Sequence, residues 1–485
     1  MTMTNSNKFY VTTSIPYANA KPHLGHAMEF IEADVIARWH RLRGDDVLLQ
    51  IGTDEHGQKL FEAATEAGQD PAEFVRSMSQ TFVELASENR LNITYDQFIR
   101  TTDTAHKSAA QQLWQACAKD IYKGEYGGLY CTACERYYTE KEAVEGKCPI
   151  HPNRTLEELK MESYFLKLEP YQKQLTELIK SDEYKVFPAL RKNEILSFLE
   201  NNQLEDLSIS RPKTHLEWGV EVPDDPSHVM YVWFDALANY VTGIGYGTDN
   251  ERFNTYWPAD LHIIGKDISR FHAVYWPIML LSAGIVTPKA LYVHGFINAP
   301  GGVKMSKSLG NSIEPDVIID TYGTDALRYY LLRYIPHDSD GEFGKERFHA
   351  VYTADLANDL GNLVSRVAAM SMKYNDAKFE SVPVQKLEID ELIERCANDK
   401  ALAHIFARIV EQNQAIENAK PWQLYKEDPA RAIEVLNQII SNILEVAVSL
   451  QPFLPDTATK ILRTFHDGQI DTSVGILFPK VDDVN

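Results

Sequence analysis

Two short segments carry side chains suited to holding phosphate groups. The first, His23-Leu24-Gly25-His26, follows an expected strand and immediately precedes an expected helix. The N-terminus of a helix offers unpaired N–H groups and the positive end of the helix dipole to an anion. His23 and His26 could donate hydrogen bonds to phosphate oxygens, and Gly25 would let a flat base approach the backbone. Two loop histidines taken alone are more often ordinary surface residues.

The second segment is Lys304-Met305-Ser306-Lys307-Ser308, in a loop that also contains Gly301, Gly302 and Gly310. Two lysines and two hydroxyl groups on a flexible loop suit a triphosphate whose negative charge is moving to a leaving group. A bare pair of lysines is commonly a solvated turn. The two segments together predict an enzyme that uses ATP.

A third candidate site is a cluster of cysteines in the middle of the chain. Cys131-x-x-Cys134 is followed, after thirteen residues, by Cys148-Pro149-Ile150-His151. Three thiolates and one imidazole at this spacing fit tetrahedral zinc, and four protein ligands make the site structural rather than catalytic. The alternatives are disulfides or a knuckle without metal. Clustered cysteines in a long cytosolic chain favour the metal.

The elements that must position these residues follow a repeated pattern. Residues 9–15 and 47–51 are predicted strands on either side of a predicted helix at about 27–43. Strands at 261–264 and 291–294 flank a second predicted helix at about 269–281. Both regions read as βαβ units of one parallel sheet, in which ligands bind at the carboxyl ends of the strands.

The rest of the chain differs from these two regions. Residues 121–223 are polar and aromatic, carry the cysteine cluster, and are expected to be inserted between the two halves of the sheet. No glycine occurs between Gly361 and Gly468, and long amphipathic stretches such as 401–418 and 432–450 predict a helical bundle. The expected fold class is therefore α/β: a Rossmann-like parallel sheet split by a zinc-binding insertion, followed by an all-α bundle.

Composition limits the remaining possibilities. The chain has 485 residues, which suggests several domains, and its hydrophobic content of 44% is ordinary for a globular protein. No uninterrupted apolar run is long enough to suggest a membrane span, and residues 1–8 resemble neither a signal peptide nor a transit peptide. We therefore expect a cytoplasmic protein. A net charge of −21 argues against a wholly basic nucleic-acid surface but leaves room for a local basic patch.

The two phosphate-handling segments resemble the signature sequences of the class I aminoacyl-tRNA synthetases. Further segments resemble the methionyl-tRNA synthetase family in particular, and the similarity runs over essentially the whole chain. These segments are Ser14-Ile15-Pro16-Tyr17-Ala18-Asn19, Gly52-Thr53-Asp54-Glu55-His56-Gly57, Tyr231-Val232-Trp233-Phe234-Asp235-Ala236 and Gly265-Lys266-Asp267-Ile268. The resemblance implies a methionine–tRNA ligase, which forms methionyl-adenylate and pyrophosphate from methionine and ATP. It then transfers methionine to the terminal adenosine of tRNA(Met), including the initiator tRNA.

The resemblance also implies roles for individual residues. His23, Gly25 and His26 would hold ATP, Lys304 and Lys307 the developing pyrophosphate, and Asp267 the ATP side of the site, with Mg²⁺ accompanying the nucleotide. Asp54 would hold the α-ammonium group of L-methionine. The walls of the apolar methionine pocket would be Ile15, Tyr17, Trp233, Ala236, Leu237, Tyr240, Ile268, Phe271 and His272. Leu237 stands where some relatives carry proline. An apolar pocket discriminates by only about 1–3 kcal/mol per methylene, so homocysteine is an expected competitor.

For the remaining domains the resemblance implies one structural Zn²⁺ per chain, on Cys131, Cys134, Cys148 and His151, and an anticodon-binding helical bundle. Asn362, Arg366 and Trp422 match its anticodon-reading positions, and Trp422 could stack on a base. The expected boundaries are 1–117 and 226–300 for the catalytic halves, 118–225 for the insertion, 301–350 for the Lys304 loop and stem-contact region, and 351–485 for the bundle.

Several alternatives stay open on the sequence alone. Within the same class, a cysteinyl or leucyl enzyme is the nearest rival, and the segment from Trp233 to Tyr240 with its single knuckle favours methionine. A catalytically inactive relative, acting as a tRNA-binding or interaction module, is the alternative from another functional class. Intact His23, His26, Lys304 and Lys307 argue against it. Because the sequence ends directly after the helical region, we expect a monomer without an appended dimerisation domain.

Overall fold

The computed structural model describes residues 7–131, 136–138, 143, 145–150, 152–305, 313–381 and 383–481. The chain divides into two compact units. The first comprises Met1–Pro22, Asp45–Glu84 and Tyr95–Val293, and the second comprises His23–Gly44, Leu85–Thr94 and His294–Asn485. Both units are therefore assembled from segments that lie far apart in the sequence.

Within the described part of the first unit, six strands form one central sheet in the order β3-β2-β1-β12-β13-β7. Each of the pairs β1–β2, β2–β3, β1–β12 and β13–β7 runs parallel. The strands are β1 (Lys8–Thr13), β2 (Asp46–Thr53), β3 (Gln97–Arg100), β7 (Lys185–Phe187), β12 (Leu261–Gly265) and β13 (Ala290–His294). The strand order reverses direction between β1 and β12, which is where open α/β sheets bind their ligands.

The sequence predicted four of these strands, β1, β2, β12 and β13, and predicted that they form one parallel sheet; both predictions are confirmed. Strand β7 is an addition. It lies within residues 118–225, which the sequence assigned to the insertion, and yet it pairs with β13 through Val186 and Leu291. The strand has only three residues and therefore gives little periodic signal.

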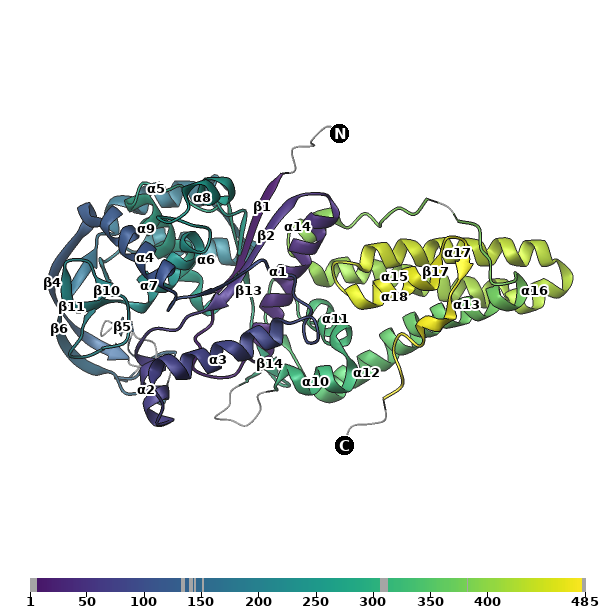
Figure 1. The fold of residues 1–485 in the computed structure, drawn as a ribbon, viewed down its shortest axis with the longest axis horizontal. Coiled ribbons are helices and arrows are strands. Elements are labelled where there is room, and N and C mark those ends of the chain that lie inside the picture. Colours follow the sequence, from purple (N-terminus) through teal and green to yellow (C-terminus); the bar gives the residue numbers. More distant parts are fainter. Residues whose placement is uncertain are drawn as a thin grey trace. The chain divides into compact units, whose positions relative to one another are not determined.

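Helices and two smaller sheets complete the first unit, and Figure 1 shows α4, α7 and α9 near one another in blue and teal. The helices are α2 (Gln58–Glu66), α3 (Pro71–Ala86), α4 (Thr104–Ala116), α5 (Glu169–Lys180), α6 (Ala189–Asn201), α7 (Val232–Thr242), α8 (Asn250–Tyr256) and α9 (Trp276–Ser282). One antiparallel sheet contains β4 (Ile121–Cys131), β5 (Arg136–Tyr138), β6 (Glu157–Leu166) and β8 (Leu207–Ser208). The other contains β9 (Ser210–Pro212), β10 (Glu221–Val222) and β11 (Asp225–Met230).

The second unit is mainly helical, as the glycine-free C-terminal sequence predicts. Its helices are α1 (Leu24–Leu42), α10 (Pro315–Tyr322), α11 (Thr324–Tyr334), α12 (Lys345–Val351), α13 (Asn362–Tyr374), α14 (Asp390–Glu394), α15 (Asn398–Ala419), α16 (Pro421–Glu427), α17 (Pro429–Leu450) and α18 (Pro455–Thr464). Short strands accompany them: β14 (Ile297–Ala299), β15 (Val303–Lys304), β16 (Gly341–Glu342), β17 (Phe465–His466) and β18 (Gln469–Ile470).

Helix α17 is the central helix of this bundle. It packs against α13, α15, α16 and α18, and Figure 1 shows α15, α17 and α18 side by side in green and yellow. Among the described residues it is the one helix long and apolar enough to cross a membrane by length and composition, but half of its most apolar stretch is buried. The core helix of a globular bundle has the same properties.

A fully buried arginine joins four segments of the second unit. The guanidinium group of Arg328 lies 2.8 Å from the Asp34 carboxylate, and it donates to the carbonyl groups of Leu91, Pro452 and Phe453. Burial opposes ionisation of Asp34, but the charges of Arg328 and Arg38 and the hydrogen bonds from Thr94 together outweigh it and lower the pKa of that carboxyl group. Removing one partner of a buried charge pair of this kind is strongly destabilising.

Candidate functional site

The carboxyl ends of β1 and β2 place Tyr17 beside Asp54. The two residues form an isolated parallel bridge, in which Asp54 N–H donates to Pro16 O and Ala18 N–H donates to Asp54 O, both at 2.9 Å. The segment after Pro16 therefore continues the pairing of the two strands beyond their regular ends. The sequence predicted both residues for the substrate site, and the fold brings them together.

Asp54 is 97% buried, and its carboxylate is oriented by its neighbours. Its Oδ1 accepts a hydrogen bond from the backbone N–H of His56 at 3.3 Å and one from the Thr101 hydroxyl at 3.4 Å. The adjacent Glu55 is fully buried and accepts from Arg100 at 2.7 and 3.0 Å. The loop after β2 is thus held rigidly by polar contacts, which suits a carboxylate that must bind a cation in one geometry.

Aromatic side chains from three segments meet in the same unit. The indole of Trp233 on α7 stacks on the ring of Phe271, with centroids 3.7 Å apart and planes 9° apart. Tyr17 meets Trp233 edge-on, with centroids 6.5 Å apart. All three side chains remain partly exposed. They offer a flat, polarizable surface at the carboxyl end of the sheet, which suits a thioether or another apolar group.

Deeper in this cluster, a buried tyrosine–histidine pair supplies a fixed polar contact. Tyr240 OH lies 2.7 Å from His272 Nε2, and His272 Nδ1 lies 3.0 Å from Ile268 O. The carbonyl can only accept, so Nδ1 of His272 carries a proton. The two contacts hold the imidazole ring of His272 in one orientation. The neighbouring His262 is also buried. Its burial, and to a smaller extent the nearby His272, keep the pKa of His262 well below the ordinary value.

The chain around Phe271 and His272 is a π-helical segment, η3 (Phe271–Tyr275), between the short η2 (Lys266–Ile268) and α9. The sequence predicted a helical stretch at about 269–281, and the region is helical, but its first part is π-helical rather than α-helical. A π-helical turn changes the direction of successive side chains and is frequent at functional sites. Asp267, another predicted site residue, is exposed on η2, directly after β12.

The remaining predicted pocket residues differ in their surroundings. Ile15 and Ile268 are partly exposed, whereas Ala236 and Leu237 on α7 are 6% and 2% exposed. Leu237 belongs to the apolar core of the first unit, together with Leu113, Trp114 and Phe234. Its position in that core is consistent with a side chain that supports α7 from behind.

Sequence reasoning missed a buried polar cluster behind the aromatic residues. The Asp235 carboxylate on α7 is held between His56 Nδ1 at 2.7 Å and His106 Nε2 at 2.8 Å. His106 Nδ1 lies 2.7 Å from the Thr242 hydroxyl. Burial opposes ionisation of Asp235, but His56 and His106 outweigh it and lower the pKa of the carboxyl group. The residues are far apart in sequence, and only their motif context could have drawn attention to His56 and Asp235.

In the second unit, His23 and His26 cap the N-terminus of α1. His23 Nδ1 accepts from Gly25 N–H at 3.0 Å, and His26 Nδ1 accepts from His23 N–H at 3.3 Å. The rings are stacked, with centroids 3.8 Å apart. Because both Nδ1 atoms accept from the backbone, the neutral tautomer of each ring carries its proton on Nε2. Each ring can therefore act as a hydrogen-bond donor at a helix N-terminus.

Gly25 is required by this cap. A Cβ atom at residue 25 would lie 2.9 Å from His23 Cε1 and 3.0 Å from His23 Nδ1, closer than side chains normally approach. Glycine thus lets the His23 ring fold back over the first turn of α1. The sequence analysis predicted a different role for this glycine, the approach of a base to the backbone, and that role stays a prediction.

Lys304 lies on the exposed hairpin formed by β14 and β15 of the second unit. Asn298 pairs with Lys304 across the hairpin, and Gly301 and Gly302 turn the chain with φ angles of 81° and 74°. The Lys304 ammonium group lies 5.8 Å from the centre of the Phe296 ring. Lys307, Ser306 and Ser308 lie outside the described residues.

Two of the four predicted zinc ligands are described. Cys131 ends β4, and it is buried in one small cluster with Cys148, Tyr138 and Leu156. Cys148 Sγ lies 3.5 Å from Tyr138 OH, and neither described thiol is in a disulfide. Cys134 and His151 lie outside the described residues. Within the described ranges no group of three metal-binding side chains occurs, which leaves the predicted site untested.

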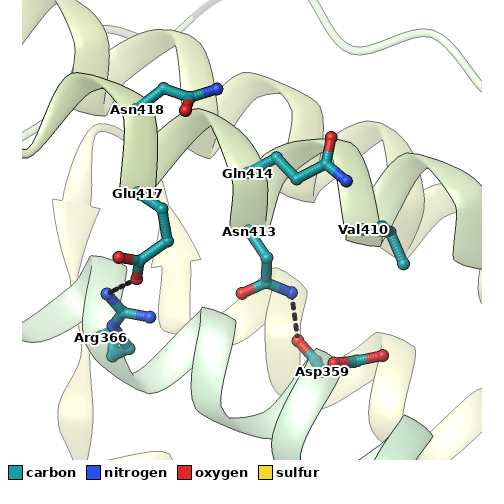
Figure 2. A pocket seen from close by; sticks show the side chains of 7 residues that line it. All are labelled: Asp359, Arg366, Val410, Asn413, Gln414, Glu417 and Asn418. Atoms are coloured by element: carbon teal, nitrogen blue, oxygen red, sulfur yellow. Dashed lines mark hydrogen bonds and ion pairs between the residues drawn. The ribbon is translucent and has the colours of Figure 1, made fainter.

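The helical region contains an open groove of about 410 Å³, shown in Figure 2. Arg366 on α13 donates from Nη2 to Glu417 Oε1 on α15 at 2.8 Å, and Asn413 Nδ2 donates to Asp359 O at 3.0 Å. Asp359 belongs to a second π-helical segment, η5 (Tyr352–Gly361), which leads into α13. The groove is lined by Asp359, Arg366, Val410, Asn413, Gln414, Glu417 and Asn418.

Of the three predicted tRNA-binding residues, Arg366 lines this groove. Asn362 lies exposed one turn before it on α13, and Trp422 is partly exposed near the start of α16. The side chains of Tyr374 and Tyr425 stack between α13 and α16, with centroids 4.5 Å apart. The sequence reasoning missed the α15 residues. Val410, Asn413, Gln414 and Glu417 occur at helical spacing, so a polar helix face was the available signal.

Comparison with known families covers nearly the whole chain. Residues 9–157 and 151–368 match the family described as tRNA synthetases class I (M). Residues 370–474 match the family described as the anticodon binding domain of methionyl tRNA ligase. The first match includes the sheet, the aromatic cluster and the two phosphate-handling segments, and the second lies within the helical bundle.

Individual relatives give the same result. The methionine–tRNA ligase of Clostridium acetobutylicum is 42% identical, over 99% of this chain and 79% of that protein. The methionine–tRNA ligase of Brucella suis biovar 1 is 43% identical, over 94% of this chain and 91% of that protein. Among solved structures, Mycobacterium tuberculosis methionyl-tRNA synthetase in complex with methionyl-adenylate matches with a TM-score of 0.90 and 37% identity, covering 98% of this chain and 100% of that one. This chain therefore belongs to the methionyl-tRNA synthetase family, the methionine–tRNA ligases, which are ATP-dependent class I aminoacyl-tRNA synthetases.

Proposed function

We propose that this chain activates L-methionine with ATP and transfers it to tRNA(Met), with Asp54 and the aromatic cluster as the amino-acid site. The observation that carries this assignment is the pairing of Tyr17 with Asp54, next to the stacked rings of Trp233 and Phe271. A carboxylate beside an apolar, polarizable surface matches an amino acid that has an ammonium group and a thioether.

The Asp54 carboxylate would bind the α-ammonium group. It is buried, and the hydrogen bonds from His56 N–H and the Thr101 hydroxyl to Oδ1 fix its orientation. An ion pair in a buried site gains more than one in water, provided that the geometry is fixed in advance. The contacts of His56 N–H and Thr101 supply that fixed geometry.

The thioether would lie against Trp233, Phe271 and Tyr17, with the Tyr240–His272 pair at the inner end. Sulfur contacts with aromatic rings are favourable by about 0.3–1.5 kcal/mol each. Ile15, Ala236, Leu237 and Ile268 would complete the walls or support them. A pocket of this kind selects by size and polarizability, so homocysteine, which lacks one methyl group, would be rejected only weakly.

His23 and His26 would donate from Nε2 to the phosphates of ATP, at the positive end of the α1 dipole. Lys304 and Lys307 would neutralise the pyrophosphate that leaves when the methionine carboxylate attacks the α-phosphate, and Asp267 would bind on the ATP side. Mg²⁺ accompanies ATP and neutralises part of its charge. Because phosphoryl chemistry depends mainly on alignment and charge, these residues need only position the reactants.

For the insertion we propose one structural zinc ion held by Cys131, Cys134, Cys148 and His151. The two described thiols fit this role, because they are buried in the same small cluster and are not in disulfides. The donor set of three sulfurs and one imidazole nitrogen is complete without water. The domain boundaries at residues 117, 225, 300 and 350 also stay part of this proposal.

Asn362, Arg366 and Trp422 would read the anticodon. Arg366 lies in an open groove with several amide side chains, and Trp422 is partly exposed, as a stacking platform requires. Replacing Trp422 by alanine should reduce tRNA charging at least tenfold and leave adenylate formation nearly unchanged. The Trp422→Phe variant, which keeps a stacking ring, should retain most of the charging activity.

The decisive experiment is amino-acid-dependent ATP–pyrophosphate exchange with a panel of amino acids. Exchange should occur with methionine, more weakly with homocysteine, and not with cysteine or leucine. Exchange driven by another amino acid would assign the chain to a different class I enzyme, and no exchange at all would favour a tRNA-binding module. We further propose a cytoplasmic monomer, which sedimentation at several protein concentrations would test.

A further inference from the structure

One residue contacts both parts of the proposed amino-acid site. The backbone N–H of His56 donates to Asp54 Oδ1 at 3.3 Å, while the His56 imidazole Nδ1 lies 2.7 Å from Asp235 Oδ2. Asp235 lies in the first turn of α7, two residues after Trp233. His56 thus connects the Asp54 carboxylate directly to the helix that carries Trp233.

The surroundings of His56 and Asp235 strengthen the hydrogen bond between them. The two side chains are 5% and 1% exposed, so water does not compete for the hydrogen bond. Asp235 can only accept when it is ionised, and both of its oxygens face imidazole nitrogens. Charge-assisted hydrogen bonds are shorter and roughly twice as strong as neutral ones, and the 2.7 Å distance fits that class.

The loop that carries His56 is also fixed from its other side. Trp218 Nε1 donates to Glu55 O at 2.6 Å, and Gly57 N–H donates back to Trp218 O at 3.4 Å. The rings of His56 and Trp218 lie 5.7 Å apart. The loop can therefore transmit the position of α7 to Asp54, because its backbone has little freedom to move independently.

We propose that His56 is a positioning residue for methionine, which sets the distance between the ammonium-binding Asp54 and the thioether-binding face of α7. This inference rests on the proposed roles of Asp54 and Trp233. Loss of the His56–Asp235 bond would let the two halves of the site separate slightly, and a ligand that binds both halves at once would lose affinity. ATP, which does not bridge these two residues, would bind as before.

The same carboxylate provides an internal comparison. His106 on α4 binds Asp235 Oδ1 at 2.8 Å and is as deeply buried as His56. Helix α4 carries none of the residues proposed to touch methionine. If Asp235 served only to stabilise the fold, the two histidines would have equivalent effects on methionine binding. A positioning role for His56 requires that the two histidines differ in their effect on methionine binding.

The test compares three variants in methionine-dependent pyrophosphate exchange. His56→Leu removes the side-chain bond and should raise KM for methionine roughly tenfold to a hundredfold, with KM for ATP within about twofold. In His56→Asn the amide nitrogen occupies the place of Nδ1, so this variant should recover most of the wild-type KM. His106→Leu, matched in burial and partner, should change KM for methionine less than threefold.

A binding measurement without catalysis separates the two halves of the site. Calorimetric titration should show that wild type binds methionine much more tightly than 4-(methylthio)butanoate, which has no ammonium group. In His56→Leu this preference should fall by about tenfold, because Asp54 is no longer aligned. If His56→Leu does not fold, His56→Gln, which moves the donor away from the Nδ1 position, should show the same loss relative to His56→Asn.

Two results would overturn the inference: an unchanged methionine KM in the folded His56→Leu or His56→Gln protein, or an equal rise in His106→Leu. A wild-type protein that shows no methionine-dependent exchange would overturn the proposed function itself, and this inference with it. The wild-type control thus distinguishes the two failures.

Discussion

Arg366 and Glu417 form an ion pair across the groove of the helical bundle, with Nη2 of the arginine 2.8 Å from Oε1 of the glutamate (Figure 2). Both side chains are partly exposed, at 34% and 60%. Exposed pairs of this kind contribute only about 0–1 kcal/mol. The arginine can therefore exchange its carboxylate partner for an RNA ligand at little cost in free energy.

Glu417 should compete with tRNA for Arg366. We predict that Glu417→Gln lowers KM for tRNA by about twofold to fivefold, because the competing carboxylate and its repulsion of phosphate are removed. Arg366→Gln should raise KM for tRNA at least tenfold. Pyrophosphate exchange should be unchanged in both. Steady-state aminoacylation at several salt concentrations measures these effects.

The matched control is Glu411→Gln. Glu411 lies on the same helix and pairs with Arg408 at 3.0 Å, but neither residue lines the groove. Its replacement removes the same charge from α15 and should leave KM for tRNA within about 1.5-fold. Equal improvement in the two glutamate variants would mean that only the net charge of the helix matters.

The elements around the site were predictable to the extent that they depend on local sequence. Strand β1 and helix α1 follow from a β-branched run and from helical periodicity, and α15 and α17 from long amphipathic patterns. The His56–Asp235 bond joins residues 179 positions apart, and no local pattern encodes such a contact. The π-helical segment η3 was also missed, because its hydrogen-bonding pattern depends on packing around Phe271 rather than on helix propensity.

Replacing Gly25 by alanine should disable the ATP side of the site without unfolding the protein. The new Cβ would meet the His23 ring at 2.9–3.0 Å, so the ring must leave its position over the first turn of α1. One lost donor to a developing charge typically costs about 10²–10³ in rate. We therefore expect kcat for pyrophosphate exchange to fall at least tenfold, with KM for methionine nearly unchanged.

Gly124→Ala is a suitable control for this substitution. Its Cβ would lie 3.5 Å from the Phe165 ring, an ordinary contact, and residue 124 lies on β4, which carries none of the predicted ATP-binding residues. Its exchange kinetics should match those of wild type. A Gly25→Ala enzyme with normal kcat would show that the folded-back His23 ring is dispensable.

Zinc content tests the predicted knuckle directly. Purified protein should contain one zinc per chain, and Cys148→Ser should lose most of it, because three ligands without the full charge of three thiolates bind weakly. Cys117→Ser is the matched control. Cys117 is also a buried thiol, in a different core cluster, and its replacement should leave the metal content at one. Wild-type protein with well under one zinc per chain would contradict the assignment.

The His294–Glu29 contact predicts a loss of stability at alkaline pH. His294 is buried, its Nε2 lies 2.9 Å from Glu29 Oε2, and its Nδ1 lies 2.8 Å from Gly295 O. Both ring nitrogens face acceptors, so the imidazolium form satisfies the site. Burial lowers the pKa of His294, but the bond to Glu29 and the charge of Glu32 outweigh it and raise the pKa to about 9.

An ordinary histidine has a pKa of about 6.5 in the unfolded chain. Because the folded-state pKa is higher, this contribution is fully present below about pH 6.5 and is lost as pH rises through about 9. The free energy of unfolding should therefore fall between these pH values, by at most roughly 3 kcal/mol.

Chemical denaturation at pH 6 and pH 9 should show a smaller fall for His294→Gln than for wild type. Glu29→Gln, which keeps the histidine but removes its charged partner, should also flatten the pH dependence. Parallel curves for the three proteins would show that His294 is not protonated in the folded state.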